Sequence, residues 1–232
     1  MPAMSRAVGA TMGASKAQQS PEEIVKWYKK AAQNGNPSAQ CYMGIMYRQG
    51  RYLTQNDELA AKWYAKAAAN GHAGAQCYLG ILYKHGRGVE QDDIQAARWF
   101  KKSADQKNVN ALCFLGVMHR QGRGVEQSDV KAVKLWREAA EAGHASAQSY
   151  LGVMCRQGRG TEQSDVEAVK WYRLAAEQGD AQARQFLVML ELTSPEAFVE
   201  PQKQSLLETI VMLATCRTSE KNGSSSQKIS KK

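Results

Sequence analysis

An internal repeat of 36 residues constrains this chain more than any other feature of its sequence. Residues 73–108 read AGAQCYLGILYKHGRGVEQDDIQAARWFKKSADQKN, and the same outline recurs in residues 37–72, 109–144 and 145–180. A repeat of this length is typical of arrays in which each unit is too small to bury its own apolar face and buries it by stacking on its neighbours. The chain therefore has to be interpreted in this register.

Several residue types occupy the same position in every repeat. One column is alanine, two are glycine, one is aspartate and one is aromatic. The aligned residues are Ala39, Ala75, Ala111 and Ala147; Gly44, Gly80, Gly116 and Gly152; Gly50, Gly86, Gly122 and Gly158; Asp57, Asp93, Asp129 and Asp165; and Tyr64, Phe100, Trp136 and Tyr172. This many aligned columns exclude a chance similarity between the blocks.

Each repeat predicts a pair of helices joined by a glycine-containing loop. In the first complete repeat, Ala39 and Met43 begin an apolar pattern with helical spacing over residues 38–47. Asp57 is predicted to be the N-cap of the second helix, because its carboxylate can accept a backbone N–H of the first turn. Gly71 is predicted to end that helix at the position where a positive φ is often needed.

The glycine inside each first helix predicts a close approach of helices. Glycine in a helix interior costs about 1 kcal/mol relative to alanine. Its recurrence from Gly44 to Gly152 therefore indicates that a neighbouring helix leaves no room for a β-carbon. The alanine and aromatic columns are interpreted in the same way, as core packing rather than as a cofactor site.

Taken together, these columns resemble the Sel1-like repeat, a relative of the tetratricopeptide repeat. The residues that carry the resemblance most clearly are Ala75, Leu79, Gly80, Tyr83, Gly86, Arg87, Gly88, Val89, Asp93, Ala97, Trp99, Phe100 and Ala104. The resemblance covers residues 21–192 and implies an all-α fold, a right-handed α/α solenoid (superhelix) of 36-residue helix-turn-helix repeats. It also implies a scaffold or adaptor for protein complexes without catalysis of its own.

Three positions depart from the family pattern. Tyr52 replaces a loop glycine, Lys107 replaces the glycine that closes a repeat, and Leu135 replaces a tryptophan. Each departure weakens one column and leaves the others in phase.

The repeat frame divides the chain into a disordered leader, the repeat array, a capping region and a disordered basic tail. These parts are residues 1–20, 21–192, 193–216 and 217–232, and the array consists of a half unit 21–36, full units 37–72, 73–108, 109–144 and 145–180, and a half unit 181–192. Val188 stands in the glycine column of the last half unit, as expected where no close second helix follows. A capping box at Ser205–Glu208 precedes an apolar helical segment. We expect that helix to cover the open end of the array, and a partner- or membrane-binding helix is the alternative.

Composition and charge exclude several functions. No apolar run approaches the roughly 20 residues of a membrane span, and the leader has no apolar core like that of a signal peptide. We therefore expect a cytoplasmic protein, with a mitochondrial transit peptide as the alternative because the leader lacks acidic residues. Of the net charge of +9, the tail carries +4 and the leader +2, which leaves +3 on residues 21–216. With no recognition module for nucleic acid, no specific nucleic-acid binding is predicted, and the chain is expected to be a monomer.

The cysteines and histidines predict no metal, cofactor or catalytic site. Cys41, Cys77 and Cys113 fall in one column. Neighbouring helices pack about 8–10 Å apart, too far for a disulfide or a shared tetrahedral zinc, so free buried thiols are expected. No two histidines have the spacing of metal ligands, and no histidine has a serine or cysteine at a partner position in the repeat frame.

The predicted binding surface is a ladder of polar side chains on the first helices, which line the concave face in this architecture. Its members are Arg48, Lys84, Arg120 and Arg156; Arg51, Arg87, Arg123 and Arg159; and Gln40, Gln76 and Gln148. Arginine binds carboxylates and phosphates through bidentate hydrogen bonds, so the ladder is suited to bind an acidic segment of a protein partner. A solvated surface, partly neutralised by nearby glutamates such as Glu90, is the alternative.

The predicted function is that of a non-catalytic scaffold or adaptor that binds a protein partner on this face. The alternative in another class is a receptor for an anionic ligand, such as an acidic peptide, a glycan or a nucleic acid. An enzyme ranks third, because no catalytic constellation is present in the repeat frame.

Overall fold

In a computed structural model of the chain, the structure describes residues 20–198, and all regular structure within that range is helical. Ten α-helices are followed by one short 3-10 helix. They are α1 (Pro21–Gln33), α2 (Pro37–Gln49), α3 (Asp57–Ala69), α4 (Ala73–His85), α5 (Asp93–Asp105), α6 (Val109–Gln121), α7 (Asp129–Glu141), α8 (Ala145–Gln157), α9 (Asp165–Glu177), α10 (Ala181–Thr193) and η1 (Pro195–Phe198). The predicted leader, the basic tail and most of the predicted capping region lie outside the described residues.

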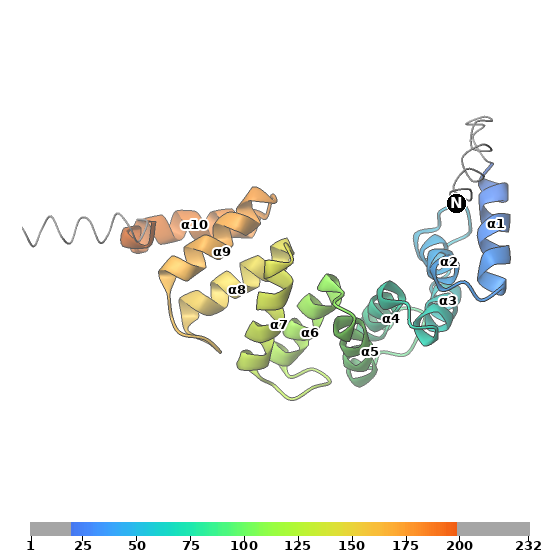
Figure 1. Ribbon diagram of the computed structural model, residues 1–232, viewed down its shortest axis with the longest axis horizontal. Coiled ribbons are helices and arrows are strands. Elements are labelled where there is room, and N and C mark those ends of the chain that lie inside the picture. Colours follow the sequence, from blue (N-terminus) through green and yellow to red (C-terminus); the bar gives the residue numbers. More distant parts are fainter. Residues whose placement is uncertain (1–19, 199–232) are drawn as a thin grey trace, which may run out of the picture. The chain divides into compact units, whose positions relative to one another are not determined.

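The helices belong to two compact units. Unit one runs to Ala111 and includes Arg123–Val125, and unit two comprises Leu112–Gly122 and the chain from Glu126 on. Helices α1 to α5 each pack on the next in unit one, and α7 to α10 do so in unit two (Figure 1). Packing only between neighbours is the property of a repeat solenoid, so the predicted all-α solenoid fold is confirmed.

The second helix of each repeat begins with a cap that the sequence interpretation misplaced by one residue. The N-cap of α3 is Asn56, whose side chain accepts the Leu59 N–H at 2.8 Å. The prediction that Asp57 is the N-cap is therefore wrong, because Asp57 is already the first helical residue. Residue 56 has the extended backbone that an N-cap requires. The Asp57 carboxylate is thereby left available for a contact with the next repeat.

The turn that closes each second helix has the expected left-handed residue. Gly71 has φ +81°, and its N–H donates to the Ala68 carbonyl while the His72 N–H donates to the Ala67 carbonyl. These two bonds satisfy carbonyls at the helix end, and they confirm Gly71 as the C′ residue. Lys107 occupies the same place after α5 and takes the same conformation, with φ +62°.

Replacing Lys107 by glycine should stabilise the protein. A left-handed conformation costs a residue with a side chain about 1–2 kcal/mol, and glycine avoids this cost while losing more backbone entropy on folding. We expect Lys107→Gly to raise the free energy of unfolding by about 0.5–1 kcal/mol in urea denaturation. Lys62→Gly, in the middle of α3, is the control and should lose about 1 kcal/mol. Equal losses for the two variants would contradict the strain at residue 107.

The glycine inside each first helix faces an aromatic ring from the second helix of the same repeat. A Cβ added to Gly44 would lie 2.6 Å from the Tyr64 ring, and one added to Gly80 would lie 2.8 Å from Phe100. The same approach occurs at Gly116 and Gly152. Real Cβ contacts are never this short, so the predicted lack of room for a β-carbon is confirmed. The neighbour that comes so close is a ring rather than a helix backbone.

A second glycine lies where one repeat meets the next. Gly88, in the loop after α4, has φ +67°, and an added Cβ would collide with the Asp57 carbonyl at the start of α3. Tyr52 takes the same left-handed conformation one repeat earlier, with φ +66° and a side chain partly open to solvent. At this loop position, the left-handed conformation alone does not require glycine. Contact of the loop with the preceding second helix does require it.

The described cysteines lie in the core. None of the four forms a disulfide within residues 20–198, and Cys216 lies outside that range. Burial raises the pKa of the Cys41 thiol to about 11, so this thiol is protonated and poorly reactive at neutral pH. Between residues 20 and 198, no helix combines the length and the apolar character needed to cross a membrane.

Candidate partner-binding surface

A half-buried aromatic side chain on each first helix forms the centre of the candidate surface. Four of these rings pack against an aromatic ring of the preceding second helix, and centroid distances are 4.2 Å for Tyr28–Tyr42, 5.1 Å for Tyr64–Tyr78, 5.1 Å for Trp136–Tyr150 and 5.0 Å for Tyr172–Phe186. The buried rings hold the outer rings in place. The outer rings keep an accessible edge, which suits them to contact a partner.

The first arginine column lies against these rings. The Arg48 guanidinium carbon is 5.2 Å from the centroid of the Tyr78 ring, one repeat further along the chain. Burial raises the pKa of Tyr64, and the positive charge of Arg48 opposes that rise, which places the guanidinium close to both tyrosines. Arg48 is thus held between two repeats by cation–π contact.

Arg120 and Arg156 have similar surroundings in unit two. Burial raises the pKa of Tyr150, and the charge of Arg120 opposes the rise. The charge of Arg156 acts in the same way on Tyr172, and Arg156 Nη1 lies 3.8 Å from the Met189 sulfur. Among the described residues, no ion pair involves Arg48, Arg120 or Arg156. These three charges are half-buried and lack a carboxylate partner among residues 20–198. Lys84 occupies the same column in the intervening repeat, and it is also half-buried.

The second arginine column is used within the array. The shortest nitrogen–oxygen distances of its ion pairs are 3.1 Å for Arg87–Asp57, 2.9 Å for Arg123–Asp93 and 3.0 Å for Arg159–Asp129. Each pair joins one repeat to the repeat before it. Arg51 differs, because the residue thirty positions before it is Pro21, and its guanidinium donates to the Tyr52 hydroxyl at 3.0 Å instead.

The glutamine column is buried rather than displayed. Gln40, Gln76 and Gln148 are 4–5% exposed. Their Nε2 groups donate to the carbonyls of Ala32, Ala68 and Ala140 at 3.1–3.2 Å, and their oxygens accept from Asn70, Gln106 and Gln178 at 2.8–3.0 Å. Each glutamine thus spans two interfaces between helices and has no side-chain group directed to solvent. The predicted ladder thus separates into the column of Arg48, Arg120 and Arg156, whose charges have no ion pair among the described residues, and two columns that are bonded within the array.

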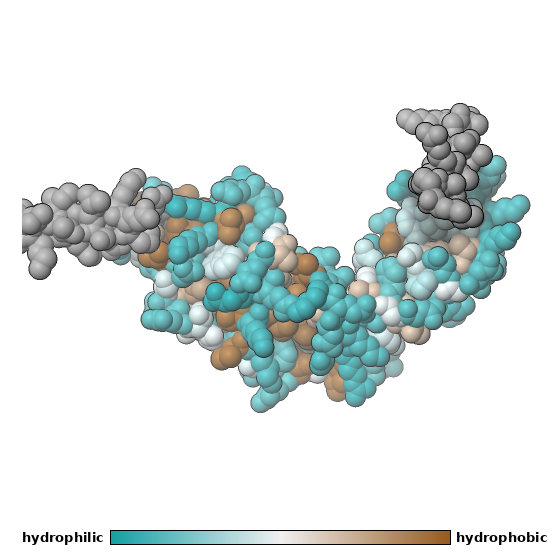
Figure 2. Space-filling model, viewed as in Figure 1, coloured by the Kyte–Doolittle hydropathy of each residue, from teal (hydrophilic) through white to brown (hydrophobic). Residues whose placement is uncertain are grey.

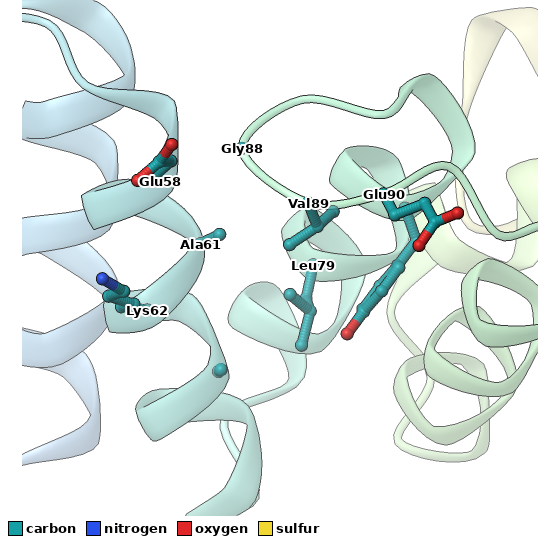
Figure 3. Close-up of a pocket in the computed structure, with 9 residues that line it drawn as sticks. Glu58, Ala61, Lys62, Leu79, Gly88, Val89 and Glu90 are labelled. Carbon is teal, nitrogen blue, oxygen red and sulfur yellow. The ribbon is translucent and has the colours of Figure 1, made fainter.

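A groove between α3 and α4 is a separate surface of unit one (Figure 3). Its volume is about 570 Å³, its floor is apolar, with Ala61, Leu79 and Val89, and Glu58 and Glu90 stand at its rim (Figure 3). Sequence reasoning missed this groove, although the repeat frame contains a signal for it. Ala65 lines the groove, where the other second helices carry Lys29, Lys101, Arg137 and Arg173.

The equivalent place in unit two is occupied by a long side chain. Arg137 aligns with Ala65, and Cys155 aligns with Tyr83 of the groove lining. Burial raises the pKa of Cys155 and the charge of Arg137 opposes the rise, so this guanidinium lies near Cys155. Ala65 thus leaves room in unit one where the aligned residue of unit two is a long basic side chain.

Two of the histidines act as helix caps. Nδ1 of His72 accepts the Ala75 N–H at 3.1 Å, and Nδ1 of His144 accepts the Ala147 N–H at 3.2 Å. Burial lowers the pKa of His144, which favours the neutral ring that this cap needs. Within the part of the chain that the structure describes, no three His, Cys, Asp or Glu side chains gather as metal ligands would.

Stacked pairs of helices with a 36-residue period, joined by side-chain links from repeat to repeat, define an α/α repeat protein. The match to a known family covers most of the chain. The Sel1 repeat family matches residues 14–36, 37–72, 73–108, 109–144 and 145–180. The chain therefore belongs to the Sel1 repeat family, whose members generally mediate protein–protein interactions and are generally non-catalytic.

Two solved structures are similar over most of this chain. One is a protective antigen present in uropathogenic Escherichia coli strains and displaying an SLR fold, with 33% identity and a TM-score of 0.71. That match covers 78% of this chain and 39% of the antigen, so this chain spans well under half of its length. The other is a Sel1 repeat protein from Oxalobacter formigenes, with 31% identity, a TM-score of 0.69, and coverage of 75% of this chain and 71% of that one. No curated protein matches the chain.

Proposed function

We propose that this protein is a non-catalytic interaction scaffold that binds an acidic segment of a partner protein on the first helices within one of its compact units. The observation that carries the proposal is the state of Arg48, Arg120 and Arg156. They are half-buried and lack a carboxylate among the described residues. A guanidinium already held in place loses little freedom when it binds a carboxylate, so its contact contributes more to affinity.

The aromatic column adds the second part of the proposed surface. Tyr42, Tyr78 and Tyr150 are half-buried rings on the same helices as the arginines. Tyrosine and arginine are enriched among the residues that dominate binding energy at protein interfaces. A bound segment would lay apolar or aromatic side chains on the rings and place its carboxylates on the guanidinium groups. A glycan or nucleic acid would use the charges alone.

The experiment compares two double variants that remove the same charge. Arg120→Ala with Arg156→Ala removes two arginines without an ion pair, and Arg123→Ala with Arg159→Ala removes two that pair with aspartates. The probe is a fluorescein-labelled decaglutamate peptide, measured by anisotropy. We expect the first double variant to weaken binding by about 1 kcal/mol per lost contact, and the second to weaken it much less. Equal losses would show that only net charge matters, and would contradict the proposed surface.

Further variants locate the binding if the arginines are not involved. Deletion of residues 217–232 removes a charge of +4, close to half of the chain's net charge of +9. If this deletion abolishes binding while the first double variant binds normally, the tail is the anion-binding element and the proposal fails. Ala65→Arg fills the groove of unit one, and a loss of binding in this variant alone would place the partner there. A heparin oligosaccharide or oligothymidylate that binds as well as decaglutamate, with a steep loss at high salt, would favour the polyanion receptor.

A further inference from the structure

Helix α10 exposes an apolar side at the end of unit two. Val188 is 60% exposed, Met189 36% and Leu192 81%, and apolar surface gathers over this helix in Figure 2. The opposite side of α10 is in the core, where Ala183 and Leu190 are fully buried. In every earlier repeat, the second helix covers the corresponding side of the first helix. None of the described residues covers this side of α10.

Residue 188 shows what kind of side chain can cover α10. It stands in the column of the first-helix glycines. At the four glycines of that column, an added Cβ would lie 2.5–2.8 Å from the nearest atom of the facing aromatic ring. Val188 carries a Cβ and two methyl groups in this place. A second helix that presents an aromatic ring in the usual register therefore cannot close on α10.

The chain that follows the described residues lacks such a ring. Beyond residue 198 there is no Phe, Tyr or Trp, and the predicted helical segment 205–213 offers Leu206, Leu207, Ile210 and Val211 instead. Each complete repeat combines glycine with a ring, and the last combines valine with aliphatic side chains. The larger residue on α10 would then meet smaller side chains than a ring, as a well-packed interface requires.

The described end of the chain lies beside the face to be covered. Helix η1 packs against α9 and α10. The Ser194 hydroxyl donates to the Asp165 carboxylate at 2.7 Å, where earlier repeats use an arginine, and this bond holds the chain as it leaves α10. Only residues 199–204 separate η1 from the apolar segment, and a linker of that length reaches at most about 20 Å.

We propose that residues 205–213 pack on the exposed side of α10, and that Val188 makes this end of the array accept that segment and reject another repeat helix. The helix that would compete by its type is α1 of a second copy. It is a second helix with no first helix before it among residues 20–198, and its Trp27 is 65% exposed.

Docking of α1 on α10 would complete a repeat between two molecules and would add further copies head to tail, as heterologous contacts do. Tyr28 of α1 stands in the aromatic column, so its ring would meet Val188. Glycine at residue 188 would admit the ring, and valine excludes it. Val188 thus acts as a terminator of the array as well as a packing residue for the segment.

The first experiment measures whether the segment covers residue 188 in the full chain. Val188→Cys is introduced alone and together with Leu207→Asp and Ile210→Asp, and its alkylation by a maleimide is followed by peptide mass spectrometry. We expect the thiol to react at least tenfold faster when the two aspartates displace the segment. Ser205→Asp with Thr209→Asp adds the same charge on the polar side of the segment and should leave the rate unchanged. Circular dichroism checks that all variants keep their helical content.

Two results would overturn this part of the proposal. One is an equal rate with and without the aspartates at residues 207 and 210, which would mean that the segment does not cover α10. The other is protection of the thiol that grows with protein concentration, which would identify a second copy as the cover.

The second experiment tests the terminator directly by sedimentation velocity over a range of protein concentrations. With the segment displaced by Leu207→Asp and Ile210→Asp, the chain with Val188 should remain a monomer. The same chain with Val188→Gly should form oligomers whose size grows with concentration, and Tyr28→Ala should reverse this. A monomer with glycine at residue 188 would show that valine does not limit the array.

Discussion

Gly80→Leu should lower the free energy of unfolding by about 3 kcal/mol or more. The space that leucine needs is occupied by the Phe100 ring, 2.8 Å from the position of an added Cβ. Both residues lie in the core of unit one, so neither helix can move without opening contacts elsewhere. Insertion of extra atoms into such a core typically costs about 1–3 kcal/mol, and leucine adds a whole side chain. Urea denaturation followed by circular dichroism measures the change.

The matched control for this substitution is Gln95→Leu, on the partly exposed surface of α5. It should change stability by less than about 1 kcal/mol. A double-mutant cycle then identifies the contact, because Gly80→Ala should cost less when Phe100→Ala has already removed the ring. Similar effects of Gly80→Leu and Gln95→Leu would contradict the close approach.

Gly88→Ala should destabilise the junction between two repeats more than its backbone conformation alone explains. Gly86 and Gly88 have nearly equal φ angles, +65° and +67°, so alanine is equally strained at both. At Gly86 the added Cβ meets only the Gln91 Cβ at 3.3 Å, whereas at Gly88 it collides with the backbone of α3. We expect Gly88→Ala to cost at least about 2 kcal/mol more than Gly86→Ala.

The comparison of these two alanine variants isolates the collision from the strain. Chemical denaturation of both proteins under the same conditions is sufficient. If the two variants lose equal stability, the loop does not touch α3 in the way described, and the glycine serves only its φ angle.

The fold was predictable because its signals repeat in phase. The pairing of Gly44 with Tyr64 is a weak argument in one repeat, but four repetitions leave only one register in which every glycine meets a ring. The cap at Asn56 was misplaced because Asp57 is an equally good cap by chemistry. Only the backbone conformation decides between two adjacent candidates.

The candidate surface was predictable only in part. Arg48 and Arg51 differ by three positions and are chemically identical, so the sequence predicts one ladder where the structure has two columns. What separates the columns is a carboxylate thirty residues away, since Asp57 accepts Arg87 and no such acid reaches Arg48. Burial of Gln40 was missed for the same reason, because its partner Asn70 lies in another helix. Helical periodicity describes one helix at a time and carries no information about these pairs.

Side-chain links within and between repeats share one spacing, and this has a consequence for how such a chain can change in length. Arg87 with Asp57, Asn70 with Gln40, Gln106 with Gln76 and Arg159 with Asp129 each join residues thirty positions apart. After duplication or loss of a whole repeat, each donor therefore again has an acceptor of the same kind at the same spacing. An insertion of one residue inside a repeat instead changes the spacing of every pair that spans it. The array can thus grow or shrink by modules at little cost, while small insertions and deletions are tolerated only where no link spans them.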